Sequence, residues 1–534
     1  MPTNCIPFRD TNYFSAFICD YLEQKPELTA FYDRFPKIEN FKNQLDDKQE
    51  SFPLAHREVL QNVLEIQYKN INTSELTQTN ISLLGNKTTF TITTGHQLNL
   101  FTGPLYFLYK IISAINTVKI LKEKYPSYDF VPVYWMATED HDFEEINYFN
   151  LFGKKIQWNR ADGGAVGIFD TDGLDKVFEI FSSEIGLGKN ADRLRLLFKE
   201  AYLKHTNLAE ATRYLANELF SSYGLVIIDA DNKELKKLFV PYMERELLEK
   251  ISYQHVLPAS GKLHEKGYKV QVNPREINLF YLSKGSRERI IEKNDSYAVN
   301  NTEIIWSKND ILQELSEFPE RFSPNVMMRP LYQEVILPNL CYIGGGGELA
   351  YWLELKDYFE AVEIPFPILL LRNSVVIKSD KQAEKLKKLK ITDRELFLKQ
   401  YELINHRVRK ISNIDINFDE QRKHLIDQFK RMYELAEQTE VTFINAVKAQ
   451  EVKQLKGLDV LEKRLLKAQK RKLGDHVKRI TILQNEIFPN QSLQERTTNF
   501  SEMYLEYGER LIPELMKNLN PLLGEFIVLT PENT

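Results

Sequence analysis

The sequence predicts an α/β fold with a Rossmann-like parallel sheet, and two motif-bearing turns separated by a helix carry that prediction. A strand-like run over 88–93 leads into Thr94-Gly95-His96-Gln97, and a helical pattern follows over about 105–124. The apolar run 130–137 then ends at Glu139-Asp140-His141-Asp142. This order of strand, turn, helix, strand and turn begins an open parallel sheet. Ligands of such sheets bind beyond the carboxyl ends of the strands, where both turns fall.

Further strands are expected over 225–229, 339–343 and 368–371, at intervals longer than one crossover helix needs. We therefore expect a core over 1–378 with a helical N-terminal segment and insertions at about 150–215 and 258–320. The second insertion is predicted to be β-rich, with strands over 269–272 and 277–282.

After residue 378 the composition turns to charged, helix-forming sequence, which predicts a coiled-coil domain over 379–490 and a return to the core over 491–534. Spacings of three and four place one set of apolar residues on one face of a first helix and a second set on one face of a second helix. We expect the helical pattern to break near Gly457 and the two helices to pair antiparallel. The first set is Leu425, Phe429, Met432, Ala436 and Phe443, and the second is Leu466, Leu473, Val477, Ile480 and Ile487. Apolar residues in excess of one hairpin contact predict a homodimer. The basic stretch 463–479 interleaves with seam positions, which favours a solvated coiled-coil face over a nucleic-acid site.

The bulk composition excludes several classes of protein. With 534 residues, 43% of them hydrophobic and 27% charged, the chain is typical of a globular cytoplasmic protein of several domains. A net charge of −5 argues against nucleic acid as a partner, and no apolar stretch approaches the roughly 20 residues of a membrane span. Three scattered cysteines, Cys5, Cys19 and Cys341, predict neither a disulfide framework nor a cysteine-rich metal site.

The turn after the first strand is the first candidate site. Gly95 and Gly103 permit tight turns and close approach of a ligand, and the amides at the start of the following helix suit an anion such as a nucleotide phosphate. Thr94, His96, Gln97 and Thr102 crowd the same loop and favour binding, with His96 a candidate catalytic residue. A plain strand-to-helix connection is the alternative.

The acidic turn is the second candidate site. Glu139, Asp140, His141 and Asp142 place three carboxylates and an imidazole on consecutive residues at a strand end, as an acid/base site or an ammonium pocket requires. A metal held with His96 is less favoured, because consecutive side chains point in different directions, and no metal is predicted. Helix capping by Asp140 or Asp142 is the alternative for one of these residues.

Two further segments are predicted to line the same edge of the sheet. Gly344, Gly345, Gly346 and Gly347, followed by Glu348, let the backbone wrap closely around a bound group, and a flexible linker is the alternative. Asp229 follows a strand and is either a site residue or a turn former. Cys341 is interpreted as a buried apolar residue.

Taken together, these blocks resemble the bacillithiol-synthesis cysteine ligase family over nearly the whole chain. The matching segments are Thr94 to Gln97, Phe101 to Tyr106, Pro132 to Phe143, Gly224 to Asp231, Phe322 to Val326, Arg329 to Gln333, the tetraglycine block and Leu493 to Arg496. The resemblance implies a Rossmann-type core related to class I aminoacyl-tRNA synthetases, with two inserted connecting regions and a coiled-coil tail that supports dimerisation. It also implies the last step of bacillithiol synthesis, in which the carboxyl group of cysteine is joined to the amine of glucosaminyl malate.

This sequence departs from the expected patterns in three ways. His96 stands where many relatives are expected to have glutamine, and Ile377-Lys378-Ser379 is only a faint echo of the lysine-rich loop of class I synthetases. Cysteine and histidine zinc ligands of the kind that cysteine-selecting synthetases use are also missing, so cysteine would be recognised without metal. Activation by ATP, with ATP or ADP bound, is expected. A catalytically silent, nucleotide-binding dimeric scaffold is the alternative function.

A second nucleotide site is predicted where the core meets the tail. Its residues would come from both flanks of the tail: Arg372, Asn373 and Ser374, then Gln494, Arg496, Asn499 and Tyr504. Arg372 and Arg496 could bind phosphate through bidentate contacts. In the alternative reading they brace the junction through carboxylates such as Glu495.

Overall fold

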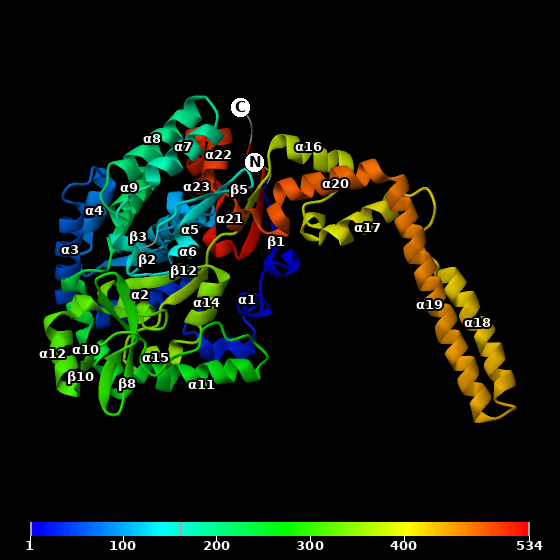
Figure 1. The fold of residues 1–534 in the computed structure, drawn as a ribbon, viewed down its shortest axis with the longest axis horizontal. Helices are drawn as coiled ribbons and strands as arrows, with labels where there is room; N and C mark the ends of the chain where they lie inside the picture. The colour runs from blue at the N-terminus through cyan, green and yellow to red at the C-terminus, as the bar shows by residue number, and fades with distance from the viewer. Residues whose placement is uncertain (1–2, 161–162, 532–534) are drawn as a thin grey trace. The chain divides into compact units, whose positions relative to one another are not determined.

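The central element of the fold is a five-stranded parallel sheet in the order β13-β12-β2-β3-β6 (Figure 1). The structure is a computed structural model that describes residues 3–160 and 163–531. The strands are β2 (Thr89–His96), β3 (Asp129–Met136), β6 (Val226–Asp229), β12 (Asn339–Gly344) and β13 (Ile368–Leu371). All five predicted strands are confirmed, and so is the predicted α/β fold.

The strands of this sheet are buried on both of its faces. All eight residues of β2 are buried, and the β12 residues are buried throughout, as the near-continuous apolar runs predict. Helix α5 (Tyr106–Lys124) packs against β2 and β3, and Ala114 and Leu121 of α5 share one core cluster with Phe90 and Ile92. The helices that surround this core before β2 are α1 (Ala16–Leu22), α2 (Phe41–Ser51), α3 (Leu54–Tyr68) and α4 (Glu75–Leu83).

The crossover from β3 to β6 carries the first insertion. It contains α6 (Phe143–Ile146), the hairpin of β4 (Tyr148–Leu151) and β5 (Lys154–Gln157), and the helices α7 (Leu174–Glu184), α8 (Lys189–Leu203) and α9 (Leu208–Phe220). Aromatic rings form the centre of this region, where Phe181 and Phe198 stack at 5.5 Å and both contact Phe101. The insertion is thereby anchored to the loop that follows β2.

The crossover from β6 to β12 carries an antiparallel five-stranded sheet in the order β10-β9-β8-β7-β11. Its strands are β7 (Leu279–Ser283), β8 (Ser286–Lys293), β9 (Ser296–Val299), β10 (Ile305–Trp306) and β11 (Phe322–Pro324), with α10 (Lys233–Glu249), α11 (Ile251–Glu265) and α12 (Lys308–Glu317) around it. Two expectations were wrong here: residues 258–265 are helical, and 269–272 are not a strand. The backbone amide of Gln271 donates to the carboxylate of Glu354 instead of joining a strand ladder.

The last crossover and the two ends of the chain complete this unit. Helices α13 (Arg329–Ile336), α14 (Gly346–Trp352) and α15 (Lys356–Ala361) flank β12. Strand β1 (Thr3–Pro7) pairs antiparallel with β15 (Glu525–Leu529), and β14 (Val375–Ile377) completes that three-stranded sheet. The returning segment adds α21 (Gln494–Thr497), α22 (Phe500–Tyr507) and α23 (Leu511–Asn518), and residues 493–529 cluster with the Rossmann-like unit.

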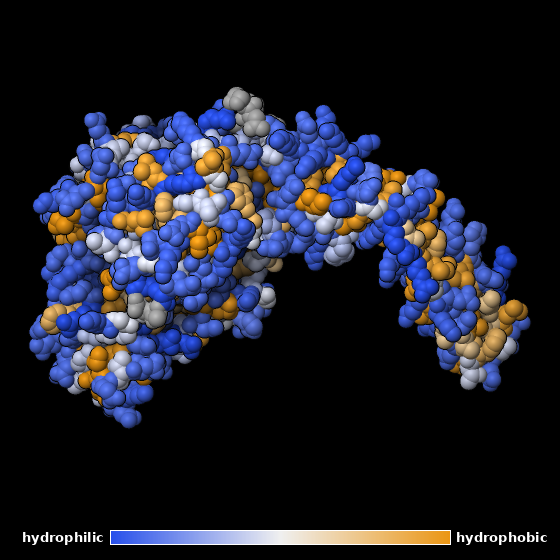
Figure 2. Space-filling view, turned by 45° about the horizontal axis from the view of Figure 1, so that its top comes forward, coloured by the Kyte–Doolittle hydropathy of each residue, from blue (hydrophilic) through white to orange (hydrophobic). Residues whose placement is uncertain are grey.

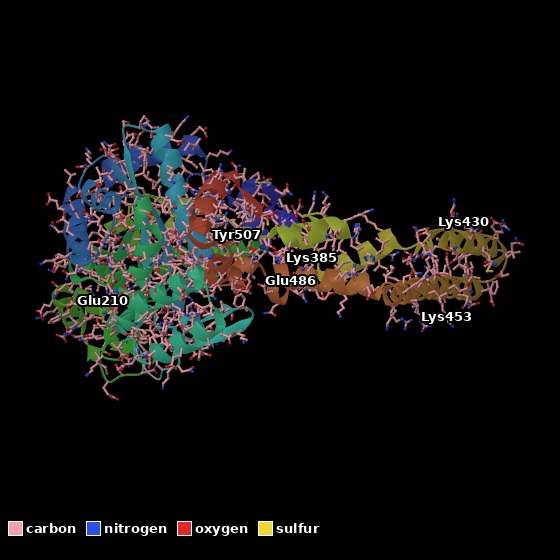
Figure 3. The ribbon with its side chains drawn as sticks, turned by 90° about the horizontal axis from the view of Figure 1, so that it is seen from above. Glu210, Lys385, Lys430, Lys453, Glu486 and Tyr507 are labelled. Atoms are coloured by element: carbon pink, nitrogen blue, oxygen red, sulfur yellow. The ribbon has the colours of Figure 1, made fainter. Side chains whose placement is uncertain are left out.

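Residues 377–492 form a separate helical unit. Its helices are α16 (Asp380–Leu389), α17 (Gln400–Ile411), α18 (Asp419–Ala436), α19 (Val441–Lys472) and α20 (Gly474–Ile487). Lys385 of α16 pairs with Glu486 of α20 at 3.3 Å, and both are labelled in Figure 3. Helices α18 and α19 lie side by side as an antiparallel coiled coil, closed by the turn at 437–440.

The internal seam of the coiled coil differs from the predicted one. Helix α19 continues through Gly457, because one glycine costs a helix only about 1 kcal/mol. Phe429, Ala436 and Val447 are buried between the two helices, whereas Met432 is 38% and Phe443 is 49% exposed. Apolar side chains therefore remain on the outer surface of the hairpin, where Figure 2 shows them among polar neighbours.

Candidate functional site

A cavity of ≈890 Å³ lies at the carboxyl ends of β2, β3 and β12, where the sequence predicts the site. It brings together most of the residues predicted from the first turn, the acidic turn and the tetraglycine block, together with the two arginines of the predicted second site. These are Gly95, His96, Gln97, Glu139, Asp140, His141, Gly345, Gly346, Gly347, Glu348, Arg372 and Arg496.

The other predicted site residues are not part of its lining among the described residues. These are Thr94, Thr102, Gly103, Asp142, Asp229, Gly344, Asn373, Ser374, Gln494, Asn499 and Tyr504. Most of them have structural contacts instead. Thr94 donates its hydroxyl to the carbonyl of Ile343, Asp229 accepts from Thr138 at 2.5 Å, and Asp142 is exposed to solvent.

Thr102 and Gly103, at the start of α5, lie outside the described lining of the cavity, and Gly103 has a structural explanation. Gly103 has φ +62°, and a Cβ there would lie 2.7 Å from the Cβ of Asn99, so glycine is required by the backbone and by packing. The side chain of Asn499 donates to the carbonyls of Phe101 and Gly103, and the amide of Leu105 donates to the carbonyl of Thr498. The returning C-terminal segment thus occupies this turn.

The predicted second nucleotide site divides into structural residues and cavity residues. Arg372 forms a buried ion pair with Glu495 at 2.8 Å, as the bracing alternative predicted. Asn373 bonds to Ser113 and Asn520, and Ser374 accepts from Arg372. The two arginines nevertheless line the main cavity, together with the residues of the first turn and the acidic turn.

His96 is buried at the base of the cavity and is neutral. Burial, reinforced by the neighbouring Lys110 ammonium, lowers the pKa of His96 to about 3. An imidazole with this pKa is not protonated to imidazolium near neutral pH, so it is neither a general acid nor a strong base there. The predicted acid/base role of His96 is therefore disfavoured, and its ring instead packs against Tyr106 and Phe107.

Asp140 belongs to a group of two carboxylates bridged by one amide. The Nε2 atom of Gln97 donates to Asp140 at 2.8 Å and to Glu145 at 2.9 Å. Burial alone would raise the pKa of Asp140, but hydrogen bonds from His141 and Gln97 outweigh burial and hold the pKa well below its ordinary value. Asp140 is therefore an anion throughout the physiological range and is suited to hold a cation. Glu145 lies on the four-residue helix α6 and was not predicted.

Glu139 has a different environment, because a buried lysine neutralises it. Lys236 of α10 is 1% exposed and pairs with Glu139 at 2.6 Å and with Asp231 at 2.8 Å. Burial raises the pKa of Glu139 even with this ammonium beside it. Two neighbouring carboxylates thus differ in pKa, which is the arrangement that separates a cation holder from a proton acceptor.

His141 links the acidic turn to the antiparallel sheet. Its Nδ1 atom lies 3.0 Å from the guanidinium of Arg287, which also donates to Ser323 and to the carbonyl of Pro324. Because arginine can only donate, His141 Nδ1 is the acceptor in this contact. Phe280 stacks on the same guanidinium at 4.2 Å. The second insertion therefore supplies one wall of the cavity.

Another part of the lining contains two basic residues that the sequence reasoning missed, Lys110 and Arg329. Lys110 of α5 is 4% exposed, pairs with Glu348 at 2.6 Å and donates to the carbonyl of Gly95 at 2.7 Å. Glu348 also accepts from Tyr342 and from the amide of Gly345. Arg329 at the start of α13 lies over the rings of Trp135, Tyr342 and Trp352 at 5.5–5.8 Å. A single lysine inside the apolar run 105–118 was the available signal for Lys110.

The lining as a whole is more basic than the protein. It contains seven basic side chains, Lys110, Arg275, Arg287, Arg289, Arg329, Arg372 and Arg496, against four carboxylates, Glu139, Asp140, Glu145 and Glu348. A chain of net charge −5 has thus gathered an excess of positive charge in one cavity. Anionic ligands are favoured at such a site.

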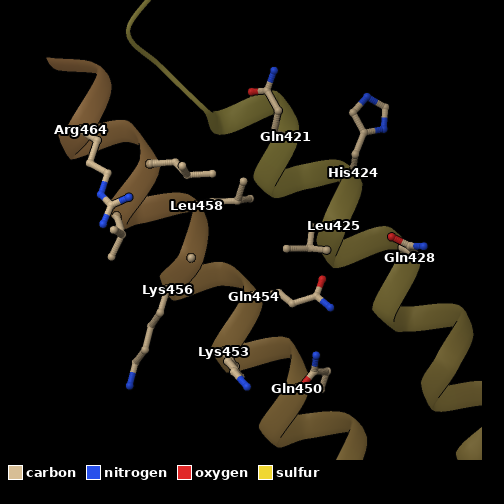
Figure 4. A pocket seen from close by; sticks show the side chains of 13 residues that line it. Gln421, His424, Leu425, Gln428, Gln450, Lys453, Gln454, Lys456, Leu458 and Arg464 are labelled. Carbon is tan, nitrogen blue, oxygen red and sulfur yellow. The ribbon is translucent and has the colours of Figure 1, made fainter. Parts of the chain in front are cut away.

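A second hollow lies on the helical hairpin and has a different character. It is a groove between α18 and α19 with Gln421, His424, Leu425, Leu458 and Arg464 along it (Figure 4). Its described lining holds no carboxylate, hydroxyl or thiol side chain. Within residues 3–160 and 163–531, no group of three or more His, Cys, Asp or Glu side chains is placed to hold a metal ion. The same ranges contain no helix long and apolar enough to cross a membrane.

A parallel sheet with a polar cavity at its carboxyl edge defines a Rossmann-like protein with a small-molecule site. Residues 1–373 match the family described as "Bacillithiol biosynthesis BshC, N-terminal Rossmann-like domain", and residues 375–531 match its "C-terminal coiled-coil domain". The chain therefore belongs to the BshC family.

Similar proteins are found in several bacteria under one name, "Putative cysteine ligase BshC". The relative from Christiangramia forsetii is 62% identical over 534 residues, covering 99% of both chains. The relative from Flavobacterium johnsoniae is 58% identical over 530 residues, covering 99% of this chain and all of its own. A relative from Bacillus cereus is 27% identical over 518 residues and covers 94% of this chain.

Proposed function

We propose that this protein is a ligase that joins the carboxyl group of cysteine to the amine of glucosaminyl malate, the last step of bacillithiol synthesis. Membership of the BshC family and the names of the relatives support this substrate pair. The observation that carries the proposal is that one cavity holds both the carboxylates Asp140 and Glu145, bridged by Gln97, and the cations Lys110 and Arg329. Cysteine and glucosaminyl malate each bring an amine and at least one carboxylate, so a cavity that contains groups of both charges matches them.

Chemistry dictates the order of events. A free carboxylate is a poor acyl donor, so activation of cysteine by ATP precedes attack by the amine, and ATP or ADP is the expected nucleotide. In the second step the amine nitrogen bonds to the acyl carbon, the bond from that carbon to the phosphate oxygen breaks, and the amine loses one proton.

The two carboxylates of the acidic turn have separate functions in this proposal. Asp140 stays charged and holds an ammonium group, with Gln97 fixing its orientation at 2.8 Å. Glu139 has a raised pKa and is the better proton acceptor of the two. The glycines Gly345 to Gly347 leave room for substrate beside Glu348.

The same proposal includes a homodimer that works in the cytoplasm. Large apolar side chains stay exposed along the hairpin, namely Ile426, Met432, Leu435, Val441, Phe443, Val452, Val460 and Leu461. A second copy of the hairpin would bury them, as coiled-coil packing favours. Phe429 is buried within one hairpin, so it is not part of this outer surface.

The test supplies purified protein with cysteine, glucosaminyl malate and ATP and follows the amide product by mass spectrometry. We expect product that depends on all three reactants and falls at least about tenfold in Glu139→Gln, which cannot accept a proton. Serine in place of cysteine serves as the specificity control. Absence of product from folded wild-type protein would contradict the ligase function, and full activity in Glu139→Gln would remove Glu139 from the mechanism.

A further inference from the structure

Four cations from separate parts of the chain meet at the basic wall of the cavity. Lys110 comes from α5, Arg329 from α13, Arg372 follows β13, and Arg496 lies on α21. Arg372 and Arg496 both act electrostatically on Tyr106, whose ring lies 5.0 Å from the Arg372 guanidinium. These four side chains and Tyr106 are called the basic wall below.

The charges of the basic wall are not balanced by the protein. Glu348 pairs with Lys110, and Glu495 pairs with Arg372. No ion pair is found for Arg329 or Arg496 in the described part of the chain. The Nη1 atom of Arg329 donates to the neutral side-chain amide of Gln333. Four cations thus face two carboxylates. An excess of partly buried positive charge is unfavourable until an anion enters.

Two buried guanidinium donors without a hydrogen-bond partner also indicate that an anion binds here. The Nε atom of Arg372 and the Nη2 atom of Arg329 are buried and have no hydrogen-bond partner among the described residues. A buried donor without a partner is rare and calls for a specific explanation. A small movement of either side chain would bring its donor to a bound oxygen.

Glycine backbone provides the space beside both arginines. A Cβ built on Gly345 would lie 3.7 Å from Arg372 Nε, and one built on Gly95 would lie 3.9 Å from Arg329 Nη1. A side chain at either position would extend into the space in front of a guanidinium. The carboxyl ends of β2 and β12 therefore leave this side of the cavity open.

We propose that the basic wall is a subsite for an oxyanion, a carboxylate or phosphoryl group of a substrate, with Arg496 as its accessible anchor. Arginine suits both groups because its planar guanidinium forms two parallel hydrogen bonds with either. The identity of the occupants rests on the proposed function. They are the malate carboxylates of the acceptor or the phosphates of the nucleotide. The acidic turn in the same cavity then holds the ammonium group.

Binding without turnover tests this subsite. Isothermal titration calorimetry with L-malate and, separately, with pyrophosphate is carried out on the full chain in the absence of cysteine and ATP. We expect at least one of the two anions to bind the wild type, more weakly at high salt. Arg496→Gln should weaken that binding at least about tenfold, because one charge-assisted bidentate contact is lost. Arg496 is exposed and unpaired, so the variant should fold.

Arg245→Gln is the matched control, because Arg245 is a 40% exposed arginine on α10 that does not line the cavity. Its affinity should stay within about twofold of wild type. Selective loss in Arg496→Gln supports the subsite, and the anion that binds identifies the source. If Arg496→Gln is unfolded, Arg496→Lys, which keeps the charge but not the bidentate geometry, is measured in its place.

Three results would overturn the proposal: no binding of either anion, wild-type affinity in the Arg496 variant, or equal loss in both variants. Product formation is scored separately. A wild type that binds the anion but makes no amide counts against the ligase function and leaves the subsite in place. A protein that makes the amide but shows no anion binding at Arg496 supports the ligase function and counts against the subsite.

Discussion

Removing the charge of Lys236 should destabilise the Rossmann-like unit strongly. The Lys236 side chain is 1% exposed and neutralises Glu139 and Asp231, which are themselves 13% and 22% exposed. Lys236→Met keeps the approximate length of the side chain but leaves the two carboxylates facing each other. Breaking a buried ion pair by removing one partner costs about 3–5 kcal/mol, so we expect a loss in that range. Lys233→Met is the control, because Lys233 is 40% exposed and pairs with Glu320 at 3.4 Å; its expected cost is about 0–1 kcal/mol.

Urea unfolding followed by tryptophan fluorescence measures this difference. The four tryptophans all precede residue 353, so their emission reports the Rossmann-like unit and not the helical hairpin. Adding Asp231→Asn to Lys236→Met should recover part of the loss, because one uncompensated charge disappears. If Lys236→Met unfolds within about 1 kcal/mol of its control, the buried network does not stabilise the fold as argued here.

Three further predictions concern other parts of the molecule. His96→Gln should leave the pH dependence of product formation between pH 6 and 9 unchanged, because burial keeps the pKa of His96 near 3; a lost or shifted limb would restore an acid/base role. Gly103→Ala should lower the urea midpoint, since its φ of +62° and the Asn99 contact at 2.7 Å both oppose a Cβ, whereas Gly347→Ala, with nothing within 4 Å, should not. If the proposed dimer forms through the hairpin, Met432→Glu with Leu435→Glu should convert it to a monomer in sedimentation velocity, because both side chains are exposed on α18 and their burial against the second copy would be lost; a persisting dimer would place the interface elsewhere.

The sheet was predictable from the sequence because its strands are buried on both faces. Such strands read as continuous apolar runs, and the turns that follow them carry the polar residues. The acidic turn and the tetraglycine block could be assigned to one edge of the sheet for the same reason. Residues 269–272 alternate like a strand but have no partner strand, and only the tertiary structure shows that their backbone bonds to Glu354 instead.

The basic wall could be predicted only in part. Arg372 and Arg496 were expected to bind phosphate together, but no pattern in the sequence linked Lys110 or Arg329 to them, and Arg287 reaches the cavity from an inserted sheet. Their convergence depends on three-dimensional packing across more than 200 residues of sequence. Gly103 shows the opposite error: its backbone conformation is special, as predicted, but packing against Asn499 and Asn99 explains it without a ligand.

The most direct test of the central claim compares Asp140→Asn with Asp142→Asn in the ligation of cysteine to glucosaminyl malate. The two residues lie in the same turn, but Asp140 lines the cavity and is held by Gln97, whereas Asp142 is exposed to solvent and outside the lining. We predict that Asp140→Asn lowers kcat/KM at least about 100-fold, roughly 2.7 kcal/mol of lost stabilisation, while Asp142→Asn stays within about twofold of wild type. Equal activities in two folded variants would contradict an ammonium site at Asp140.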